Sequence, residues 1–183
     1  MGRLRIWDIG GNDGHFSLIV QPHSDAVLCT DIDPVAVDTN YRRCLERGDD
    51  RLLPLIVDYA NPTPGIGFAN TERRDLQSRV ARFGPDCILA LALIHHLCLS
   101  NNCSFGMLAD SFSSQAPNLV IEFVRPEDSW AAKLLASKRE SRALFDYYGE
   151  AAFEAEFARR YEILERAPVP DSARTLYRMR GRA

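Results

Sequence analysis

The stretch that decides the fold is residues 4–20, LRIWDIGGNDGHFSLIV. Its first six residues, Leu4–Ile9, are mostly apolar and predict a buried strand, which two consecutive glycines end. A short helix is expected over His15–Gln21, before Pro22. A strand, a glycine turn and a helix in this order are typical of the first unit of a parallel α/β sheet.

Apolar runs and amphipathic stretches alternate along the rest of the chain. The apolar runs predict further strands at Ala26–Ile32, Leu53–Asp58, Cys87–Leu93, Leu119–Val124, Tyr161–Pro168 and Arg174–Met179. The amphipathic stretches predict helices at Pro34–Arg47, Asn70–Phe83, His96–Leu99, Phe105–Ser114, Pro126–Arg139 and Glu150–Arg160. The last two strands are joined by a short turn, which favours an antiparallel hairpin. Five β/α units followed by a hairpin predict an α/β fold with a mostly parallel sheet.

Length and composition indicate a single globular domain. The chain has 183 residues, of which 46% are hydrophobic and 26% are charged, so disordered chains, collagen and disulfide scaffolds are excluded. Its 22 Lys and Arg residues against 25 Asp and Glu residues leave a formal charge of −3. Without an excess of basic residues, binding to a nucleic acid backbone or to an anionic membrane is disfavoured.

The cysteines and the start of the chain bear on cellular location. Five cysteines form no CxxC pair, and four of them lie in or beside apolar runs, which indicates buried thiols in a reducing compartment. The first residues contain no apolar core of a signal peptide. No apolar stretch reaches the roughly 18–20 residues that a membrane helix needs. We therefore expect a cytoplasmic protein without a membrane span.

The glycine loop, residues 8–14 (DIGGNDG), carries the strongest chemical signal. Gly10 lets the backbone turn sharply out of the strand, and Gly14 lets the next helix begin close to a ligand without a Cβ in the way. The start of that helix offers N–H groups and a positive dipole end to a carboxylate or phosphate. A dinucleotide-binding loop would have the pattern G-x-G-x-x-G. Asn12 stands where its middle glycine would be, which crowds a pyrophosphate but allows a hydrogen bond to a smaller group.

Two acidic residues end the next two strands. Asp31 lies about 20 residues after the loop, where a carboxylate can accept both ribose hydroxyls, as in NAD sites. Asp33 is instead expected to cap the helix that begins at Pro34. Each acid alone would more often be a helix cap or a loop residue. Because ligands of parallel sheets bind beyond the carboxyl ends of the strands, however, Asp8, Asp31 and Asp58 are together expected at one ligand-binding edge.

The spacing Asp8-x-Gly10-x-x-x-Gly14 resembles motif I of the class I S-adenosylmethionine-dependent methyltransferases, although position 12 is most commonly glycine in that motif. Longer stretches are also similar to a bacterial subgroup of this family that is sometimes labelled nodulation-related: residues 61–76, 91–97, 120–140 and 162–179. The resemblance implies a three-layer Rossmann-like sandwich. Its sheet would be mostly parallel and seven-stranded, in the order 3-2-1-4-5-7-6, with an antiparallel last strand.

The resemblance also implies S-adenosyl-L-methionine as the cofactor. The glycine loop would wrap its amino-acid end, Asp31 would hold the ribose, and Asp58 with Tyr59 would hold the adenine. The implied cofactor-binding residues are Asp8, Gly10, Gly11, Asn12, Gly14, Asp31, Ile32, Asp58, Tyr59 and Leu93.

The fourth strand leads to His95 and His96, which the resemblance places near the transferred methyl group. A neutral imidazole with a pKa near neutrality could take the proton from an acceptor hydroxyl or amine, with His95 as the first candidate base and His96 as the second. The alternative is that one histidine packs under the cofactor and the other caps a helix. Two histidines without a third ligand at metal spacing do not indicate a metal site.

Glu122 and Phe68 are weaker candidates for the acceptor site. Glu122 stands inside an apolar strand, where a carboxylate must find a partner or face the cleft, and we favour the cleft. Phe68 could line a pocket. Amphipathic spacing around Trp130 predicts that this side chain lies in the core.

We therefore predict an S-adenosylmethionine-dependent methyltransferase that acts on an O or N of a small-molecule acceptor. Two alternatives stay open: an NAD-dependent oxidoreductase on a similar sheet, and a non-catalytic methyltransferase-like domain for binding or interaction. The first strand begins almost at Met1, whereas members of the family usually carry lid helices before it. A lid is expected from the loop at residues 61–70, from an additional domain or from a second subunit of a homo-oligomer; otherwise the chain is a fragment of a longer protein.

Overall fold

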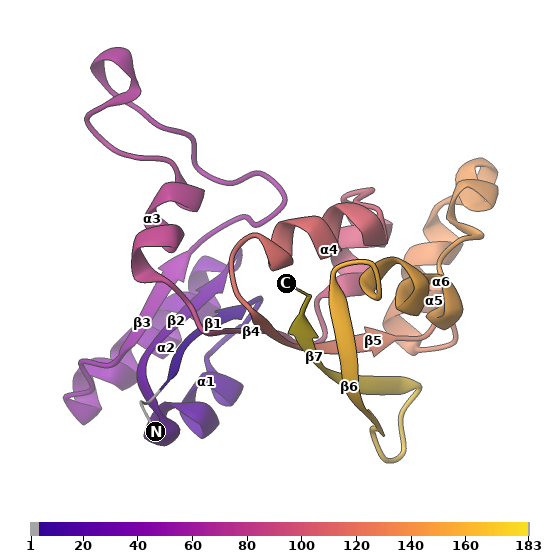
Figure 1. Ribbon diagram of the computed structural model, residues 1–183, viewed down its shortest axis with the longest axis horizontal. Helices are drawn as coiled ribbons and strands as arrows, with labels where there is room; N and C mark the ends of the chain where they lie inside the picture. Colours follow the sequence, from indigo (N-terminus) through magenta and orange to yellow (C-terminus); the bar gives the residue numbers. More distant parts are fainter. Residues whose placement is uncertain (1–3, 183) are drawn as a thin grey trace. The chain divides into compact units, whose positions relative to one another are not determined.

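The computed structural model describes residues 4–182, apart from the side chains of residues 139 and 140. The strands form a seven-stranded sheet in the order β3-β2-β1-β4-β5-β7-β6 (Figure 1), which confirms the predicted order and class. The strands are β1 (Leu4–Ile9), β2 (Ser24–Asp31), β3 (Leu52–Ile56), β4 (Cys87–Ala90), β5 (Asn118–Val124), β6 (Tyr161–Pro168) and β7 (Arg174–Gly181). The chain divides into two compact units, residues 1–89 and 90–183. That all 183 residues form one domain stays a prediction.

The first unit contains parallel strands whose register fixes the position of the predicted acids. β1 pairs with β2 on one side and with β4 on the other, so that Asp8 lies opposite Cys29 and Leu89. β2 pairs with β3, and Asp31 lies opposite Ile56. Because these strands run in the same direction, their carboxyl ends meet at one edge of the sheet. Asp8 and Asp31 therefore share that edge, as the sequence predicted.

The helical segments of this unit are α1 (His15–Val20), η1 (Gln21–His23), α2 (Pro34–Arg47), η2 (Phe68–Asn70) and α3 (Leu76–Phe83). α2 begins and ends where predicted, since the Asp33 carboxylate accepts the N–H of Val35 at 2.8 Å and Gly48 closes the helix with a φ of 60°. Pro22 does not stop the chain after α1 but lies in the 3-10 turn η1, because proline fits the first positions of a helix. In Figure 1, α3 lies on the opposite side of these strands from α1.

α3 begins later than the predicted Asn70. Ala69 and Asn70 have positive φ angles of 53° and 58°, which a right-handed helix does not tolerate. The helix starts only where the Asp75 carboxylate accepts the N–H of Ser78 at 2.8 Å. The connection from β3 to α3 therefore forms a long excursion, residues 57–75, which we call the finger and which reaches away from the strands in Figure 1.

The second unit contains the π-helical turn η3 (His96–Ser100), the helices α4 (Phe105–Ser113), α5 (Ser129–Ser137) and α6 (Glu150–Phe157), and the 3-10 segment η4 (Arg139–Phe145). β7 pairs antiparallel with both β5 and β6, which confirms the predicted hairpin. A cluster of buried aromatic side chains joins β5 and β7 to the helices: Phe105, Phe123, Tyr148, Phe153, Phe157 and Tyr177. Large aromatic side chains therefore form a substantial part of this unit's core, beside buried aliphatic residues such as Leu119 and Ile121.

Three predictions for this part of the chain were wrong. β4 ends at Ala90, earlier than predicted, and two residues later Ala92 has a positive φ of 50°. α5 begins after Asp128 rather than at Pro126, because the Asp128 carboxylate accepts the N–H of Trp130 at 3.0 Å and caps the helix. Trp130 is 55% exposed and does not lie in the core.

The thiols lie where their apolar surroundings predicted. Cys29, Cys44, Cys87 and Cys98 are buried, and Cys103 is half-buried. Within residues 4–182, no helix is both long enough and apolar enough to cross a bilayer.

Candidate functional site

The glycine loop is held to the end of β2 by backbone hydrogen bonds. The N–H groups of Gly10 and Gly11 donate to the carbonyl oxygen of Thr30 at 2.7 and 3.1 Å, and the N–H of Gly14 donates to the carbonyl of Gly11 at 2.8 Å. Gly10, Asn12 and Gly14 have φ angles of 72°, 50° and 82°. Glycine and asparagine are the residues that adopt this left-handed conformation most readily. The loop is therefore a fixed turn whose sequence matches its backbone.

Gly11 and Gly14 are also required by the space around them. A Cβ on Gly11 would lie 2.6 Å from Sγ of Cys29 and 2.8 Å from Oδ2 of Asp8. A Cβ on Gly14 would lie 2.3 Å from Nδ2 of Asn40. Since these distances are far below van der Waals contact, the backbone of the loop rests directly on the side chains beneath it.

Asp8 is buried beneath the loop, with 2% of its surface exposed. The hydroxyl of Ser17 donates to its Oδ2 at 2.7 Å. Burial raises the pKa of Asp8 to about 6, which the hydrogen bond from Ser17 partly offsets and the charge of Asp31 increases. A carboxylate in this position favours a neighbouring cation, because a positive charge would recover the energy that burial costs. Ser17 is a partner of the site that the sequence did not reveal.

Asp31 joins the end of β2 to the loop. Its Oδ2 accepts the N–H of Asn12 and its Oδ1 accepts the N–H of Asp33, both at 2.8 Å. Each carboxylate oxygen has two lone pairs, so about half of the acceptor capacity is left for hydroxyl groups. Asp31 is half-buried, and the neighbouring Ile32 is 63% exposed. A polar and an apolar contact for a ligand therefore lie side by side.

Asp58 lies just beyond the end of β3 and turns back on its own chain. Its Oδ1 accepts the N–H groups of Ala60 and Asn61 at 2.9 and 3.1 Å. The ring of Tyr59 meets the ring of Trp7 edge-on, with 5.7 Å between their centroids. Tyr59 thus contacts β1, whereas the Asp58 carboxylate bonds to its own turn through Oδ1.

Phe68 lies in the finger and is 86% exposed. Ile66 and Arg73 exchange backbone hydrogen bonds across the turn, and the Glu72 carboxylate accepts the N–H of Phe68 at 3.1 Å. These bonds order the turn within the finger itself. A role for Phe68 in an acceptor site stays a prediction.

The segment that follows β4 carries the two histidines. His95 is 2% exposed, and its Nδ1 has no hydrogen-bond partner among the described residues, whereas His96 is exposed. The two ring centroids are 4.1 Å apart. Burial, followed by the charges of His96 and Arg174, lowers the pKa of His95 to about 4, and the charge of Asp128 opposes this shift. That pKa is far below the near-neutral value expected from the sequence. Leu93, in the same segment, is half-buried.

Glu122 has found partners, although the sequence favoured a position in the cleft. It is 9% exposed, and its Oε2 accepts the N–H of Ala92 at 2.6 Å and lies 3.4 Å from Nη1 of Arg174. Nε of Arg174 donates to Oδ2 of Asp128 at 2.9 Å. Sequence analysis missed Arg174 and Asp128. The signal that could have found Arg174 is the antiparallel register of β5 and β7, in which Arg174 lies opposite Val124.

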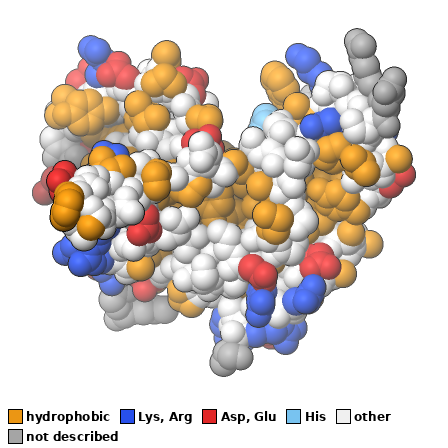
Figure 2. All heavy atoms as spheres, turned by 90° about the horizontal axis from the view of Figure 1, so that it is seen from above, with side chains coloured by type: hydrophobic (Ala, Val, Ile, Leu, Met, Phe, Trp, Pro, Cys, Tyr) orange, Lys and Arg blue, Asp and Glu red, His pale blue; other side chains and the backbone are white. Residues whose placement is uncertain are grey.

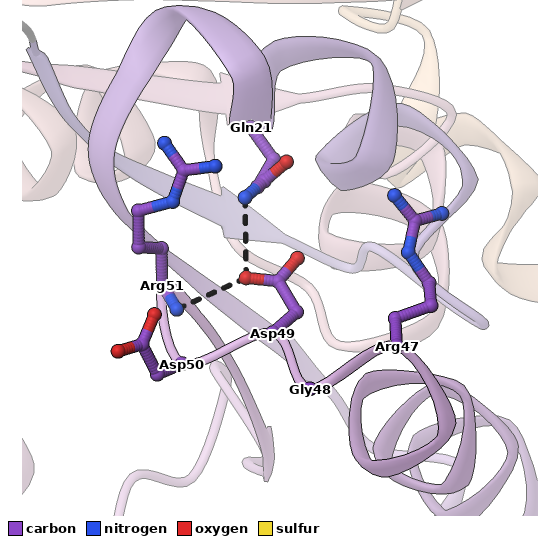
Figure 3. Close-up of a pocket in the computed structure, with 6 residues that line it drawn as sticks. All are labelled: Gln21, Arg47, Gly48, Asp49, Asp50 and Arg51. Atoms are coloured by element: carbon purple, nitrogen blue, oxygen red, sulfur yellow. Dashed lines mark hydrogen bonds between the residues drawn. The ribbon is translucent and has the colours of Figure 1, made fainter.

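A hollow of about 220 Å³ lies at the amino ends of β2 and β3 (Figure 3). Its lining residues are Gln21, Arg47, Gly48, Asp49, Asp50 and Arg51. Asp49 accepts hydrogen bonds from the side chain of Gln21 at 3.1 Å and from the N–H of Arg51 at 3.0 Å. Two arginines and two aspartates balance in charge, and none of the predicted site residues lines the hollow. We therefore do not assign the cofactor to it.

The surface offers apolar contacts as well as charges. Figure 2 shows hydrophobic side chains at the surface of the face that it presents. Exposed large hydrophobic residues include Phe16, Ile32 and Phe68 in the first unit and Met107, Trp130 and Leu144 in the second. Among residues 4–182, no group of three His, Cys, Asp or Glu side chains could hold a metal ion.

The chain is similar in sequence to one nodulation protein and in fold to solved methyltransferases. No family model matches the chain. The chain is 32% identical over 173 residues to the nodulation protein NoeA from Rhizobium meliloti (strain 1021), a match that covers 94% of the chain and 35% of the relative. The chain thus spans about a third of the length of the curated relative it matches.

Two solved structures superpose on nearly the whole chain. The N-methyltransferase NodS from Bradyrhizobium japonicum WM9, in complex with S-adenosyl-L-homocysteine, gives a TM-score of 0.63 at 15% identity over 100% of this chain and 80% of that chain. The magnesium protoporphyrin IX methyltransferase ChlM from Synechocystis PCC 6803, with bound S-adenosylhomocysteine, gives 0.65 at 14% identity over 99% and 75%. The chain has the fold of the class I S-adenosylmethionine-dependent methyltransferases. The fold that the motif I resemblance implied is therefore confirmed, and the longer stretches named in the sequence lie within the part of the chain that is similar to NoeA, a nodulation protein.

Within this methyltransferase fold, the structure joins some predicted residues and not others. Hydrogen bonds and close contacts connect Asp8, the glycine loop and Asp31. Asp58 and Phe68 are bonded within their own turns. Glu122 belongs to an ion-paired group in the second unit. The strongest part of the candidate site is consequently the edge formed by β1 and β2.

Proposed function

We propose that this chain is an S-adenosylmethionine-dependent methyltransferase domain that methylates an oxygen or nitrogen atom of a small molecule. The observation that carries the proposal is the bond from the N–H of Asn12 to the Asp31 carboxylate, which ties a glycine loop above the buried Asp8 to a second acid at the carboxyl edge. Ligands of open parallel sheets bind at this edge. The bound S-adenosylhomocysteine in NodS and ChlM supports the same assignment.

The residues present fit this cofactor. α1 begins after Gly14, which has no side chain to cap it, so N–H groups at the start of this helix can bind a carboxylate. The spare lone pairs of Asp31 suit ribose hydroxyls. A dinucleotide would bring its pyrophosphate against the side chain of Asn12, which disfavours the oxidoreductase alternative.

The proposal assigns each part of the cofactor to a set of residues. The methionine end is assigned to Asp8, Gly10, Gly11, Asn12 and Gly14, where a cationic ammonium and sulfonium would stabilise the ionised form of Asp8. The ribose is assigned to Asp31 and Ile32, the adenine to Asp58 and Tyr59, and the surroundings of the methyl group to Leu93. A cover over the cofactor is proposed to come from the finger, another domain or a second subunit.

The cofactor supplies a methyl group that is already activated as a sulfonium, so the protein has to position the acceptor, exclude water and remove a proton. We assign proton removal to His96, because it is exposed and a proton-removing group must be accessible to the acceptor's hydroxyl or amine. His95, with a pKa of about 4, is a weak proton acceptor at neutral pH. Its buried ring, 4.1 Å from that of His96, is assigned the role of orienting the base.

Calorimetric titration tests the cofactor assignment. S-adenosylhomocysteine is expected to bind, and NAD to bind at least about 100-fold more weakly, because the loop suits a nucleoside without a pyrophosphate. Preference for NAD would support an oxidoreductase, and absence of S-adenosylhomocysteine binding would contradict the proposal.

Transfer of a labelled methyl group from S-adenosylmethionine to a fractionated small-molecule extract of bacterial cells tests the reaction. Label is expected to enter the extract with the wild-type chain and not with His96→Gln, while both proteins bind S-adenosylhomocysteine equally. Tight binding without transfer by the wild type would instead favour the non-catalytic alternative.

A further inference from the structure

The connection from β4 to α4 has an irregular backbone. Ala92 adopts a left-handed φ of 50°, residues 96–100 form a π-helical turn, and Asn102 has a φ of 59°. Unlike glycine or asparagine, an alanine adopts the left-handed conformation only when its surroundings hold it there. Short π-helical segments are often found at functional sites. Ala92 therefore needs a contact that holds it in this conformation.

A hydrogen bond to Glu122 holds Ala92 in place. The N–H of Ala92 donates to Oε2 of Glu122 at 2.6 Å, across 30 residues of sequence. Glu122 stands on β5 and is nearly buried, so its position is set by the sheet. A bond from an amide to a buried carboxylate is among the stronger hydrogen bonds in proteins. The acceptor is thus a side chain that the sheet holds in place, and the donor is the backbone N–H of Ala92, the left-handed residue itself.

Arg174 keeps this carboxylate in place. From β7 its Nη1 lies 3.4 Å from Oε2 of Glu122, and its Nε donates to Asp128 at 2.9 Å. Asp128 in turn caps α5, the helix that contacts η3. Burial alone would lower the pKa of Arg174, but its two acidic partners raise it, so the guanidinium stays charged. A buried carboxylate without such a partner would be costly.

We propose that Glu122 is a positioning residue, which holds Ala92 in its left-handed conformation and thereby fixes the backbone from Leu93 to His96. This role rests on the proposed function, in which Leu93 lies by the cofactor and His96 removes the proton. Glu122 then acts through the backbone of Ala92 and does not contact the acceptor.

The test combines substitutions at both ends of the hydrogen bond. Glu122→Gln keeps the shape of the side chain but removes the charge that Arg174 holds. Ala92→Gly lets residue 92 adopt a positive φ without the Cβ penalty. The matched control is Glu150→Gln, which also neutralises a half-buried glutamate paired with an arginine, at 3.1 Å from Arg125. The readouts are the affinity for S-adenosylhomocysteine by calorimetry and the deuterium uptake of the peptide that contains residues 91–97.

Glu122→Gln is expected to weaken binding of S-adenosylhomocysteine about fivefold or more and to speed exchange in that peptide, because an uncharged amide oxygen is a weaker acceptor for the N–H of Ala92 than the carboxylate is. Adding Ala92→Gly is expected to recover at least about half of this loss on a logarithmic scale. Glu150→Gln is expected to leave both readouts within about twofold of the wild type, even if it lowers the melting temperature equally.

Two results would overturn the role of Glu122 while leaving the proposed function intact. One is unchanged affinity and exchange in Glu122→Gln when the wild type binds S-adenosylhomocysteine. The other is a loss of affinity that Ala92→Gly does not relieve and that Glu150→Gln reproduces, which would mean a general effect on stability. A wild-type protein that does not bind S-adenosylhomocysteine would overturn the proposed function itself, and with it the placement of this segment at the site.

Discussion

The backbone N–H of Asn12 donates to the side-chain carboxylate of Asp31 at 2.8 Å. This bond joins the loop after β1 to the end of β2, so Asp31 shapes the loop as well as being available to a ligand. Its neighbour Asp33 instead accepts the N–H of Val35 and caps α2. Asp31 therefore shapes the glycine loop, whereas Asp33 caps a helix, and substitution of each residue can distinguish the two roles.

We expect Asp31→Ala to weaken S-adenosylhomocysteine binding roughly 10- to 100-fold, because bonds to a charged acceptor contribute about 1.5–3 kcal/mol. Calorimetry measures this loss. Asp33→Ala is the control: it should cost about 1 kcal/mol of folding stability through loss of the helix cap and leave the affinity within about threefold. Equal affinities of Asp31→Ala and the wild type would show that Asp31 does not hold the ligand.

The two left-handed glycines Gly14 and Gly48 allow strain and crowding to be compared. Their φ angles are 82° and 60°, but a Cβ on Gly14 would strike Asn40 at 2.3 Å, whereas a Cβ on Gly48 meets nothing within 4 Å. Gly48→Ala should therefore cost about 1 kcal/mol of unfolding free energy from backbone strain. Gly14→Ala should cost roughly 2–4 kcal/mol, because overpacking is added. Chemical denaturation measures both, and similar losses would argue against the close packing beneath the loop.

Sequence patterns revealed the sheet and the loop because those features depend on local chemistry. An apolar strand followed by Gly10 and Gly14 specifies its own turn, and Asp33 before Pro34 specifies its own helix start. The order of the strands came from a family resemblance carried by the loop, and the structure confirms it.

The features that sequence analysis missed depend on contacts between distant residues. Asp128, Arg174 and Glu122 lie up to 52 residues apart in the chain, and no local pattern pairs them. The late start of α3 depends on the positive φ of Ala69, a residue that rarely adopts this conformation. The burial of His95 was also hidden, because histidine occurs both inside and outside proteins.

Asp8 should make the protein less stable as the pH rises. Its pKa is about 6 in the folded protein, above the ordinary 3.8. The folded state therefore binds this proton more tightly than the unfolded state, and the resulting stability is complete below about pH 4 and is lost as the pH rises through about 6. A shift of about two units corresponds to roughly 3 kcal/mol.

Asp8→Asn removes this titration while keeping an acceptor for Ser17. We expect the unfolding free energy of Asp8→Asn minus that of the wild type to increase by up to about 3 kcal/mol between pH 4 and pH 7. Denaturation at a series of pH values measures the difference, in which the other acids cancel. Parallel pH profiles of the two proteins would contradict the buried position of Asp8. Added S-adenosylmethionine should make this increase with pH smaller. Its cationic groups stabilise the ionised carboxylate of Asp8, and therefore the wild-type protein at higher pH.

His95 should have the opposite pH dependence. Burial lowers its pKa from 6.5 to about 4, so the unfolded chain binds the proton more tightly than the folded protein. The stability that follows is complete above about pH 6.5 and is lost as the pH falls through about 4. In proton NMR, the ring resonances of His95 should stay at their neutral positions down to about pH 5. As the pH falls, the unfolding free energy of the wild type should decrease by roughly 2–3 kcal/mol more than that of His95→Gln. An NMR titration midpoint near 6.5 would mean that the imidazole is open to solvent, and would restore His95 beside His96 as a candidate base.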